Sequence, residues 1–138
     1  MKRDPRLQGL SSDHHQGLVL ARRINQERID AAEVRQRFDA ELEPHFRAEE
    51  ELMLPALEAA GETDLARRTW GDHAAMREHL AAAERGESGR LAAFAALLEE
   101  HIRFEERELF PAAETRVPAS VLDRIHERKP HARSPAEG

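Results

Sequence analysis

One twelve-residue pattern occurs twice in this chain, and it constrains the fold more than any other feature. Residues 45–56 read HFRAEEELMLPA and residues 101–112 read HIRFEERELFPA. Each copy places a glutamate four residues after a histidine: Glu49 after His45, and Glu105 after His101. Residues four apart lie on one face of an α-helix, one turn from each other. Each copy therefore offers an imidazole nitrogen and a carboxylate to one point in space, and two such helices facing each other would form a metal cage.

The repeat extends upstream, because an Asp-His pair precedes each copy. Asp13-His14 lies before the first copy and Asp72-His73 before the second. The repeated unit is thus a helix with a histidine followed by a helix with His-x-x-x-Glu, and two units make four helices. Loops between the helical stretches are short, so successive helices should run antiparallel. We expect an all-α fold, an antiparallel up-down-up-down four-helix bundle.

Apolar periodicity and breaker residues set the expected helix boundaries. The first helix should start after Ser11 or Ser12, or slightly earlier, and end near Ile29. The second should span residues 31–59, with Pro55 ending or kinking it.

The third and fourth helices follow from caps and a turn. Thr63 or Asp64 is a good N-cap for the third helix, which should end before the turn at residues 86–89. The fourth should span residues 90–115, and a short amphipathic C-terminal helix should follow Pro118. We assign residues 1–127 to one bundle domain and residues 128–138 to a disordered tail.

The composition agrees with a helical protein and excludes several classes of function. Charged residues make up 35% of the chain and aromatic residues 4%, and runs of alanine, leucine, glutamate and arginine favour helix. The net charge of −6 gives no basic surface for nucleic acid. The lack of cysteine excludes disulfides, thiolate zinc sites and iron–sulfur clusters. No signal peptide and no span of about 20 apolar residues is visible, so we expect a cytoplasmic protein without a membrane segment.

Each expected helix carries an ionisable side chain inside its apolar stripe. His14 lies in the middle of the first stripe and His73 in that of the third. A buried carboxylate without a partner costs several kcal/mol, so two of them among four histidines would make a poor core. A bound cation removes the conflict, because it neutralises the carboxylates and accepts the imidazole lone pairs. The sequence therefore predicts a metal site with six ligands: His14, His45, Glu49, His73, His101 and Glu105.

Two of these positions have alternatives. His15 replaces His14 if the first helix is rotated, and Glu106 can replace Glu105 because it also follows His101 by about one turn. Otherwise Glu106 belongs to a solvated face. The remaining histidines and the neighbouring acids should be solvated: His79, His126, His131, Glu50, Glu51 and Glu108. Three other large side chains should pack in the bundle: Met53, Met76 and Trp70.

The ligand types also restrict the metal. Four imidazoles and two carboxylates without a thiolate suit iron, manganese or zinc. Paired glutamates in four-helix bundles usually bridge two ions, as in the di-iron carboxylate proteins. Those ferritin-type sites use Glu-x-x-His and carboxylates on the other two helices, whereas this chain has His-x-x-x-Glu and histidines there. The expected site is therefore richer in nitrogen.

The order of these motifs resembles the hemerythrin-like (HHE) domain family over roughly residues 7–117. The resemblance implies an antiparallel four-helix bundle around a non-haem di-iron centre with bridging carboxylates. It carries the ligand roles onto the same six residues and implies two iron ions as the cofactor, with manganese or zinc as alternatives. It also implies a small-molecule partner, namely oxygen, nitric oxide or peroxide.

One departure from the oxygen-carrying hemerythrins bears on function. Those carriers have a second histidine four residues after the third-helix histidine, where this chain has Arg77, and an aspartate where it has Glu106. The pattern is closer to bacterial di-iron repair proteins and the iron-sensing ubiquitin-ligase subunit. The departure argues against oxygen carriage in the manner of the invertebrate carriers. Arg77, one turn from His73, would either donate hydrogen bonds to a bound anion or close access to the metal.

The leading hypothesis is a di-iron protein that binds oxygen or a related small molecule for sensing, storage or detoxification. The lack of tyrosine and cysteine fits ligand binding better than radical chemistry. We therefore lean away from an enzyme, although a peroxidase-like or nitric-oxide-detoxifying side activity is compatible with the site. The alternatives are an iron-dependent interaction module and a metal-bound structural bundle without redox activity.

Overall fold

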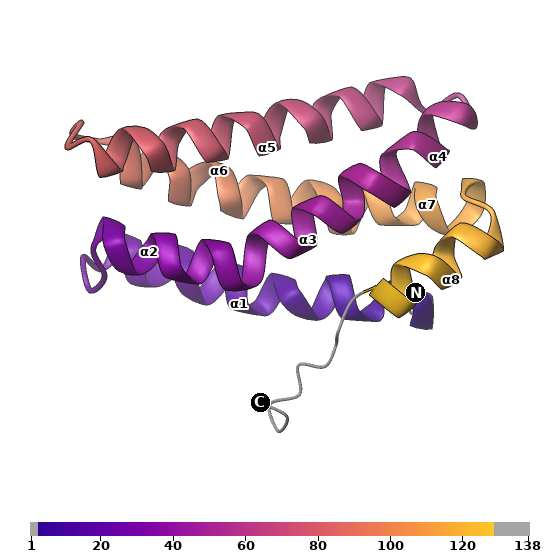
Figure 1. Ribbon diagram of the computed structural model, residues 1–138, viewed down its shortest axis with the longest axis horizontal. Helices are drawn as coiled ribbons and strands as arrows, with labels where there is room; N and C mark the ends of the chain where they lie inside the picture. The colour runs from indigo at the N-terminus through magenta and orange to yellow at the C-terminus, as the bar shows by residue number, and fades with distance from the viewer. Residues whose placement is uncertain (1–2, 129–138) are drawn as a thin grey trace.

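Four long helical stretches pack as an antiparallel, up-down-up-down bundle, as the sequence predicts (Figure 1). The computed structural model describes residues 3–128, and no β-strand occurs in that part of the chain. Two of the stretches are interrupted by π-helical segments, labelled η2 to η4. In chain order the elements are a 3₁₀ turn η1 (Pro5–Leu7), α1 (Gln8–Asn25), α2 (Ala31–Arg37), η2 (Phe38–Leu42), α3 (Glu43–Ala48), η3 (Glu49–Met53), α4 (Leu54–Ala59), α5 (Thr63–Glu84), α6 (Arg90–Phe104), η4 (Glu105–Leu109), α7 (Phe110–Arg116) and α8 (Ala119–Arg128).

The first helix is shorter than predicted at its C-terminal end. α1 ends at Asn25, four residues before Ile29, and Glu27 has a left-handed backbone with φ 57°. Asp30 then begins the second stretch with a capping box: its side chain accepts from the amide of Glu33, and the Glu33 carboxylate accepts from the amide of Asp30. This local signal fixes the start of α2 and leaves residues 26–30 as a turn.

The predicted cap of the third helix is wrong by one or two positions. The N-cap of α5 is Glu62, not Thr63 or Asp64. Gly61 precedes it with φ 92°, and the amides of Gly61 and Glu62 donate back into the last turn of α4. Glycine adopts this left-handed conformation at little cost, so the turn directly joins the end of one helix to the start of the next.

Widened helical turns accommodate three prolines inside the second and fourth stretches. Pro44, Pro55 and Pro111 each lie two residues after the end of a π-helical segment. The amide just before each proline donates to the carbonyl five residues back, for example Leu54 to Glu49. Proline has no amide hydrogen, and its ring clashes with the carbonyl four residues back, which a widened turn relieves. The second stretch therefore continues to Ala59 instead of ending at Pro55, and it changes direction between α2 and α3 (Figure 1).

The apolar core consists of two clusters, one toward each end of the bundle. α8 covers one end with Leu122 and Ile125, which are buried, so the predicted C-terminal helix packs on the bundle. Met53 and Met76 are buried as expected, but Trp70 is 42% exposed. It follows the buried Thr69, and a step of about 100° along a helix turns it toward solvent.

The C-terminal boundary differs slightly from the prediction. α8 includes Arg128, so residue 128 is helical and the predicted tail lies, apart from this residue, outside the described residues. His131 lies outside them too. Among the residues that are described, no helix is both long and apolar enough to cross a lipid bilayer.

Candidate metal centre

Six ionisable side chains are buried in the layer between the two apolar clusters. The histidine of α1 is 7% exposed, and the other five residues are at most 2% exposed. Every long stretch contributes a histidine. The second and fourth stretches also contribute a glutamate, Glu49 or Glu105, which is the first residue of a π-helical segment. The structure thus brings together all six predicted ligand residues: His14, His45, Glu49, His73, His101 and Glu105.

Glu105 lies between histidines from three helices. Its Oε1 is 2.8 Å from Nε2 of His14 and 3.3 Å from Nε2 of His45. Its Oε2 is 2.8 Å from Nε2 of His101. The two oxygens of this carboxylate therefore point toward different histidines, which is the arrangement that a bridging carboxylate requires.

Glu49 divides its oxygens in the same way. Its Oε2 is 2.9 Å from Nε2 of His45, and its Oε1 is 3.0 Å from Nε2 of His73. Together the two carboxylates thus contact two pairs of histidines, His14 with His45 and His73 with His101. The donor atoms form two groups that share Glu105, and within each group all atoms lie within 4.8 Å of one another: one group contains Glu49, His73, His101 and Glu105, and the other His14, His45 and Glu105.

Three of these buried atoms have no hydrogen-bond partner among the described residues. They are both carboxylate oxygens of Glu49 and Nε2 of His73. They lie only 2.9–3.0 Å from neighbouring donor atoms, so the contacts are close but lack hydrogen-bond angles. Leaving a buried polar atom unpaired costs about 1–3 kcal/mol. Atoms that converge without bonding to each other fit a cation placed between them, and this donor set suits iron, manganese or zinc.

An outer layer of four carboxylates orients the histidines. In each ring Nε2 faces the centre, and Nδ1 lies within hydrogen-bond distance of a carboxylate. An ionised carboxylate can only accept, so Nδ1 carries the hydrogen and Nε2 is directed inward. Histidines that bind metals usually have such a partner, which fixes the tautomer and the ring orientation. The Nδ1 pairs are His14 with Glu106 at 2.6 Å, His45 with Asp13 at 3.0 Å, His73 with Glu50 at 2.7 Å and His101 with Asp72 at 2.8 Å.

Charge and hydrogen bonding shift the ionisation of the inner residues. Burial alone would lower the pKa of His101, but the charge of Glu105 and the hydrogen bonds to Asp72 and Glu105 raise it to about 10. Burial alone would raise the pKa of Glu105, but the charge of His101 and hydrogen bonds from the surrounding histidines hold it well below its usual value. Protons therefore balance the buried carboxylates when no cation does, and a bound metal would replace protons in this layer.

A family model for the hemerythrin HHE cation-binding domain matches residues 10–113. The chain belongs to the hemerythrin HHE family. The matched region contains all six buried ionisable residues and most of the bundle, so the family resemblance and the all-α fold predicted from the sequence are confirmed. No curated protein and no solved structure gives a significant match to the chain.

The structure distinguishes between the alternative residues on the first and fourth helices of the HHE domain. His15 is exposed on α1, and it is His14 that faces the other donors. Glu105 lies among those donors, while Glu106 accepts from Nδ1 of His14. Burial alone would raise the pKa of Glu106, but hydrogen bonds from His14, Ser11 and Arg3 lower it to about 2.

The expectation of a solvated face is wrong for Glu50, whose side chain is 10% exposed, and holds only in part for Glu106, whose side chain is 34% exposed. Each follows a central glutamate, and each accepts a hydrogen bond from a histidine of another helix. Asp13 and Asp72 have the same orienting role, because each accepts a hydrogen bond from the buried histidine of the next long stretch. A signal was present in the sequence, since both the Asp-His and the Glu-Glu dipeptides are repeated. Single-helix spacing could not show that their partners lie across the bundle.

The remaining histidines of the HHE domain lie apart from the centre. His79 accepts a hydrogen bond from Nε of Arg90 at 3.1 Å, and His126 is exposed on α8. His79 is half-buried, so the expected solvated position holds for it only in part. His126 agrees with the expectation, although it belongs to a helix and not to a tail.

Arg77 does not point at the donor atoms. Its guanidinium donates to Glu50 at 2.8 and 3.2 Å and to Glu43 at 3.1 and 3.1 Å. It also lies over the ring of Phe46, 5.5 Å from its centroid. Arg77 therefore lies beside the buried layer, between α5 and the second stretch, where it holds the outer partner of His73.

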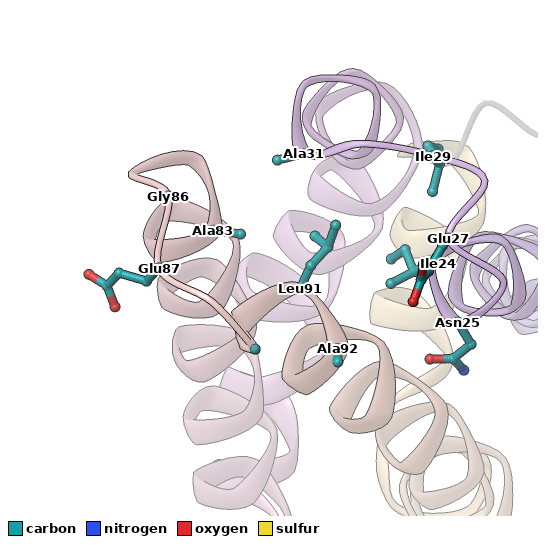
Figure 2. A pocket seen from close by; sticks show the side chains of 11 residues that line it. Ile24, Asn25, Glu27, Ile29, Ala31, Ala83, Gly86, Glu87, Leu91 and Ala92 are labelled. Atoms are coloured by element: carbon teal, nitrogen blue, oxygen red, sulfur yellow. The ribbon is translucent and has the colours of Figure 1, made fainter.

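A separate cavity of about 440 Å³ lies at the end of the bundle formed by the α1–α2 and α5–α6 connections (Figure 2). Ile24, Ile29 and Leu91 form apolar parts of its wall, and Glu27 and Glu87 are acidic. None of the six buried donors lines it, so this cavity is not part of the HHE centre.

Replacing Asp72 with asparagine is expected to weaken metal binding by roughly 10–100-fold, as for other outer partners of metal-bound histidines. The neutral amide would hold the Nδ1 hydrogen of His101 less firmly, so the ring would lose part of its orientation. Competition with a chromophoric chelator measures the dissociation constant. Asp123→Asn is the matched control, because Asp123 is exposed on α8. An unchanged affinity in Asp72→Asn would contradict the orienting role.

Proposed function

We propose that this HHE domain holds two iron ions, which Glu49 and Glu105 would share, and that the pair binds dioxygen, nitric oxide or peroxide. The observation that supports this proposal is the way each buried carboxylate directs one oxygen toward each histidine pair. A single ion in either group would leave at least two of the six residues without a metal bond. The nitrogen and oxygen donor set without thiolate favours iron, and manganese or zinc are the other candidates.

The residues of the chain have separate roles in this proposal. The four buried histidines supply nitrogen donors, and the outer carboxylates keep each Nε2 directed inward. The two apolar clusters exclude water from both ends of the centre. Two ferrous ions would supply the electrons that a bound small molecule accepts.

Binding, as opposed to turnover, is the proposed main role. The chain contains no tyrosine and no cysteine that could be oxidised. The outer carboxylates already accept hydrogen bonds from the histidine rings, and Arg77 is occupied by two glutamates. Among the described residues near the buried layer, these polar groups therefore form hydrogen bonds with the histidines or with one another, which does not favour a role in binding a substrate.

Adding dioxygen or nitric oxide to the reduced, iron-loaded protein without air is expected to produce a new visible absorption band. Stopped-flow absorbance spectroscopy measures this change, and zinc-loaded protein is the control because zinc has no accessible redox change. If the protein keeps its iron but its spectrum does not respond to either gas, the small-molecule function is wrong, and an iron-dependent interaction module becomes the better account.

A further inference from the structure

We infer that the two halves of the proposed di-iron centre release metal at different rates, the half with His14 and His45 first and the half with His73 and His101 last. Two arginines, Arg3 and Arg77, set this order by holding equivalent outer glutamates with unequal firmness. The inference rests on the proposed two-ion function, and it concerns how the chain retains the ions.

The two donor sets differ in size. Four donor atoms within 4.8 Å of one another come from Glu49, His73, His101 and Glu105, whereas the set around His14 contains three. Glu49 also approaches the smaller set, but only at His45, where its Oε2 is 2.9 Å from Nε2, so fewer donors gather closely around His14. The smaller set is therefore the more labile one.

The two sets also differ in exposure. The His14 side chain is 8% exposed, and its partner Glu106 is 34% exposed. The equivalent pair on the other side is His73 at 0% and Glu50 at 10%. Water, protons and chelators therefore reach the His14 side more easily.

The His73 side is fastened by a residue in the interior of a long helix. Arg77 donates two hydrogen bonds to Glu50 and two to Glu43, so it ties α5 to the second stretch. It belongs to α5, a helix of 22 residues, well away from both ends. Phe46 stacks on His73 with ring centroids 3.9 Å apart. Loosening this half requires disrupting packed helices, which costs a large share of the folding free energy.

The His14 side is fastened by a residue outside the helices. Arg3 donates to Oε1 of Glu106 at 3.0 Å and to its carbonyl oxygen at 3.1 Å. It also lies 5.5 Å from the ring centroid of Phe110, which stacks on His14 at 5.3 Å. Arg3 precedes η1 and lies outside every helix. Backbone outside the helices opens at lower free energy than the interior of a long helix, so this fastening releases before the one formed by Arg77.

Arg3 and Arg77 are thus positioning residues that act on the metal through Glu106 and Glu50. Each arginine neutralises an outer glutamate and fixes the direction in which it faces its histidine. Lysine keeps the charge but cannot form the paired hydrogen bonds of a guanidinium. The lysine variants should therefore lie between the alanine variants and the unmodified protein.

The test is the rate of metal release from the fully loaded, full-length protein into an excess of chromophoric chelator. We expect two phases of similar amplitude. Arg3→Ala should accelerate the fast phase by roughly 10-fold or more and leave the slow phase nearly unchanged, whereas Arg77→Ala should accelerate the slow phase. Arg3→Lys and Arg77→Lys should release metal at rates between those of the alanine variants and the unmodified protein. Arg22→Ala, at an exposed position of α1, is the matched control and should change neither phase.

The outcomes separate this inference from the proposed function. Release of two bound ions in a single phase, or equal acceleration of both phases by Arg3→Ala, overturns the unequal halves while leaving the two-ion centre in place. Binding of only one ion per chain overturns the proposed function and this inference with it. Should Arg77→Ala fail to fold by circular dichroism, Arg77→Lys supplies the comparison, and an unchanged slow phase in that folded variant counts against the role of Arg77.

Discussion

Replacing Glu105 with glutamine is expected to reduce bound metal at least 10-fold while the bundle stays helical. Glu105 belongs to both donor groups, and its oxygens face histidines from three helices. The substitution keeps the shape of the side chain but removes its negative charge. Loss of an outer partner alone costs roughly 10–100-fold in metal affinity, so loss of a shared inner carboxylate should cost more. Elemental analysis after gel filtration measures the bound metal, and circular dichroism measures the helix content.

Glu108→Gln is the matched control for this variant. Glu108 lies in the same π-helical segment but is exposed, so the same change of charge occurs outside the centre. It should retain the metal content of the unmodified protein. If Glu105→Gln and Glu108→Gln retained equal amounts of metal, Glu105 would not be a shared ligand.

Truncating Phe46 to alanine is expected to lower the free energy of unfolding by about 3–5 kcal/mol, as for other buried phenylalanines. Phe46 is 1% exposed, stacks on His73 and packs edge-on against Phe38 at 5.6 Å. Its removal would leave a cavity beside the centre and would free the ring of His73 to move. Urea denaturation of the metal-free protein, followed by circular dichroism, measures the loss separately from metal binding.

Two further variants serve as a control and as a milder substitution. Leu18→Ala removes a side chain that is already 37% exposed and should change stability by no more than about 0.5 kcal/mol. Phe46→Leu keeps most of the buried apolar surface and should lose clearly less than Phe46→Ala, so it remains measurable if the alanine variant unfolds. Equal losses in Leu18→Ala and Phe46→Ala would contradict the packing described around His73.

The duplicated motif explains why much of the fold was predictable. Two copies of a histidine helix followed by a His-x-x-x-Glu helix require four helices, and short loops require antiparallel neighbours. The same spacing identified His45 with Glu49 and His101 with Glu105, because residues four apart share a helix face. The buried positions of His14 and His73 followed from their place in the apolar stripes.

What the sequence missed depends on contacts between helices and on irregular helical turns. The roles of Asp13, Asp72, Glu50 and Glu106 arise across the bundle, and periodicity within one helix cannot show them. The π-helical segments also break the regular step of about 100° per residue, so the rotation of side chains after each segment could not be computed from a helical wheel.

The outer layer shows how one repeated unit builds both halves of the site. In each unit the aspartate before the first histidine orients the second histidine: Asp13 orients His45, and Asp72 orients His101. The glutamates that follow the central carboxylates exchange partners between the units, because Glu50 orients a histidine of the second unit and Glu106 one of the first. The two units therefore complete each other, and neither alone holds a fully oriented set of histidines.

Metal content per chain is the measurement that tests the central claim most directly. The protein should be purified without a tag from cells grown with iron available, and its metals should be quantified by elemental analysis against protein concentration. The account predicts about two iron ions per chain, one for each donor group of the buried layer. Zinc alone, or a folded bundle that carries no metal, would contradict it.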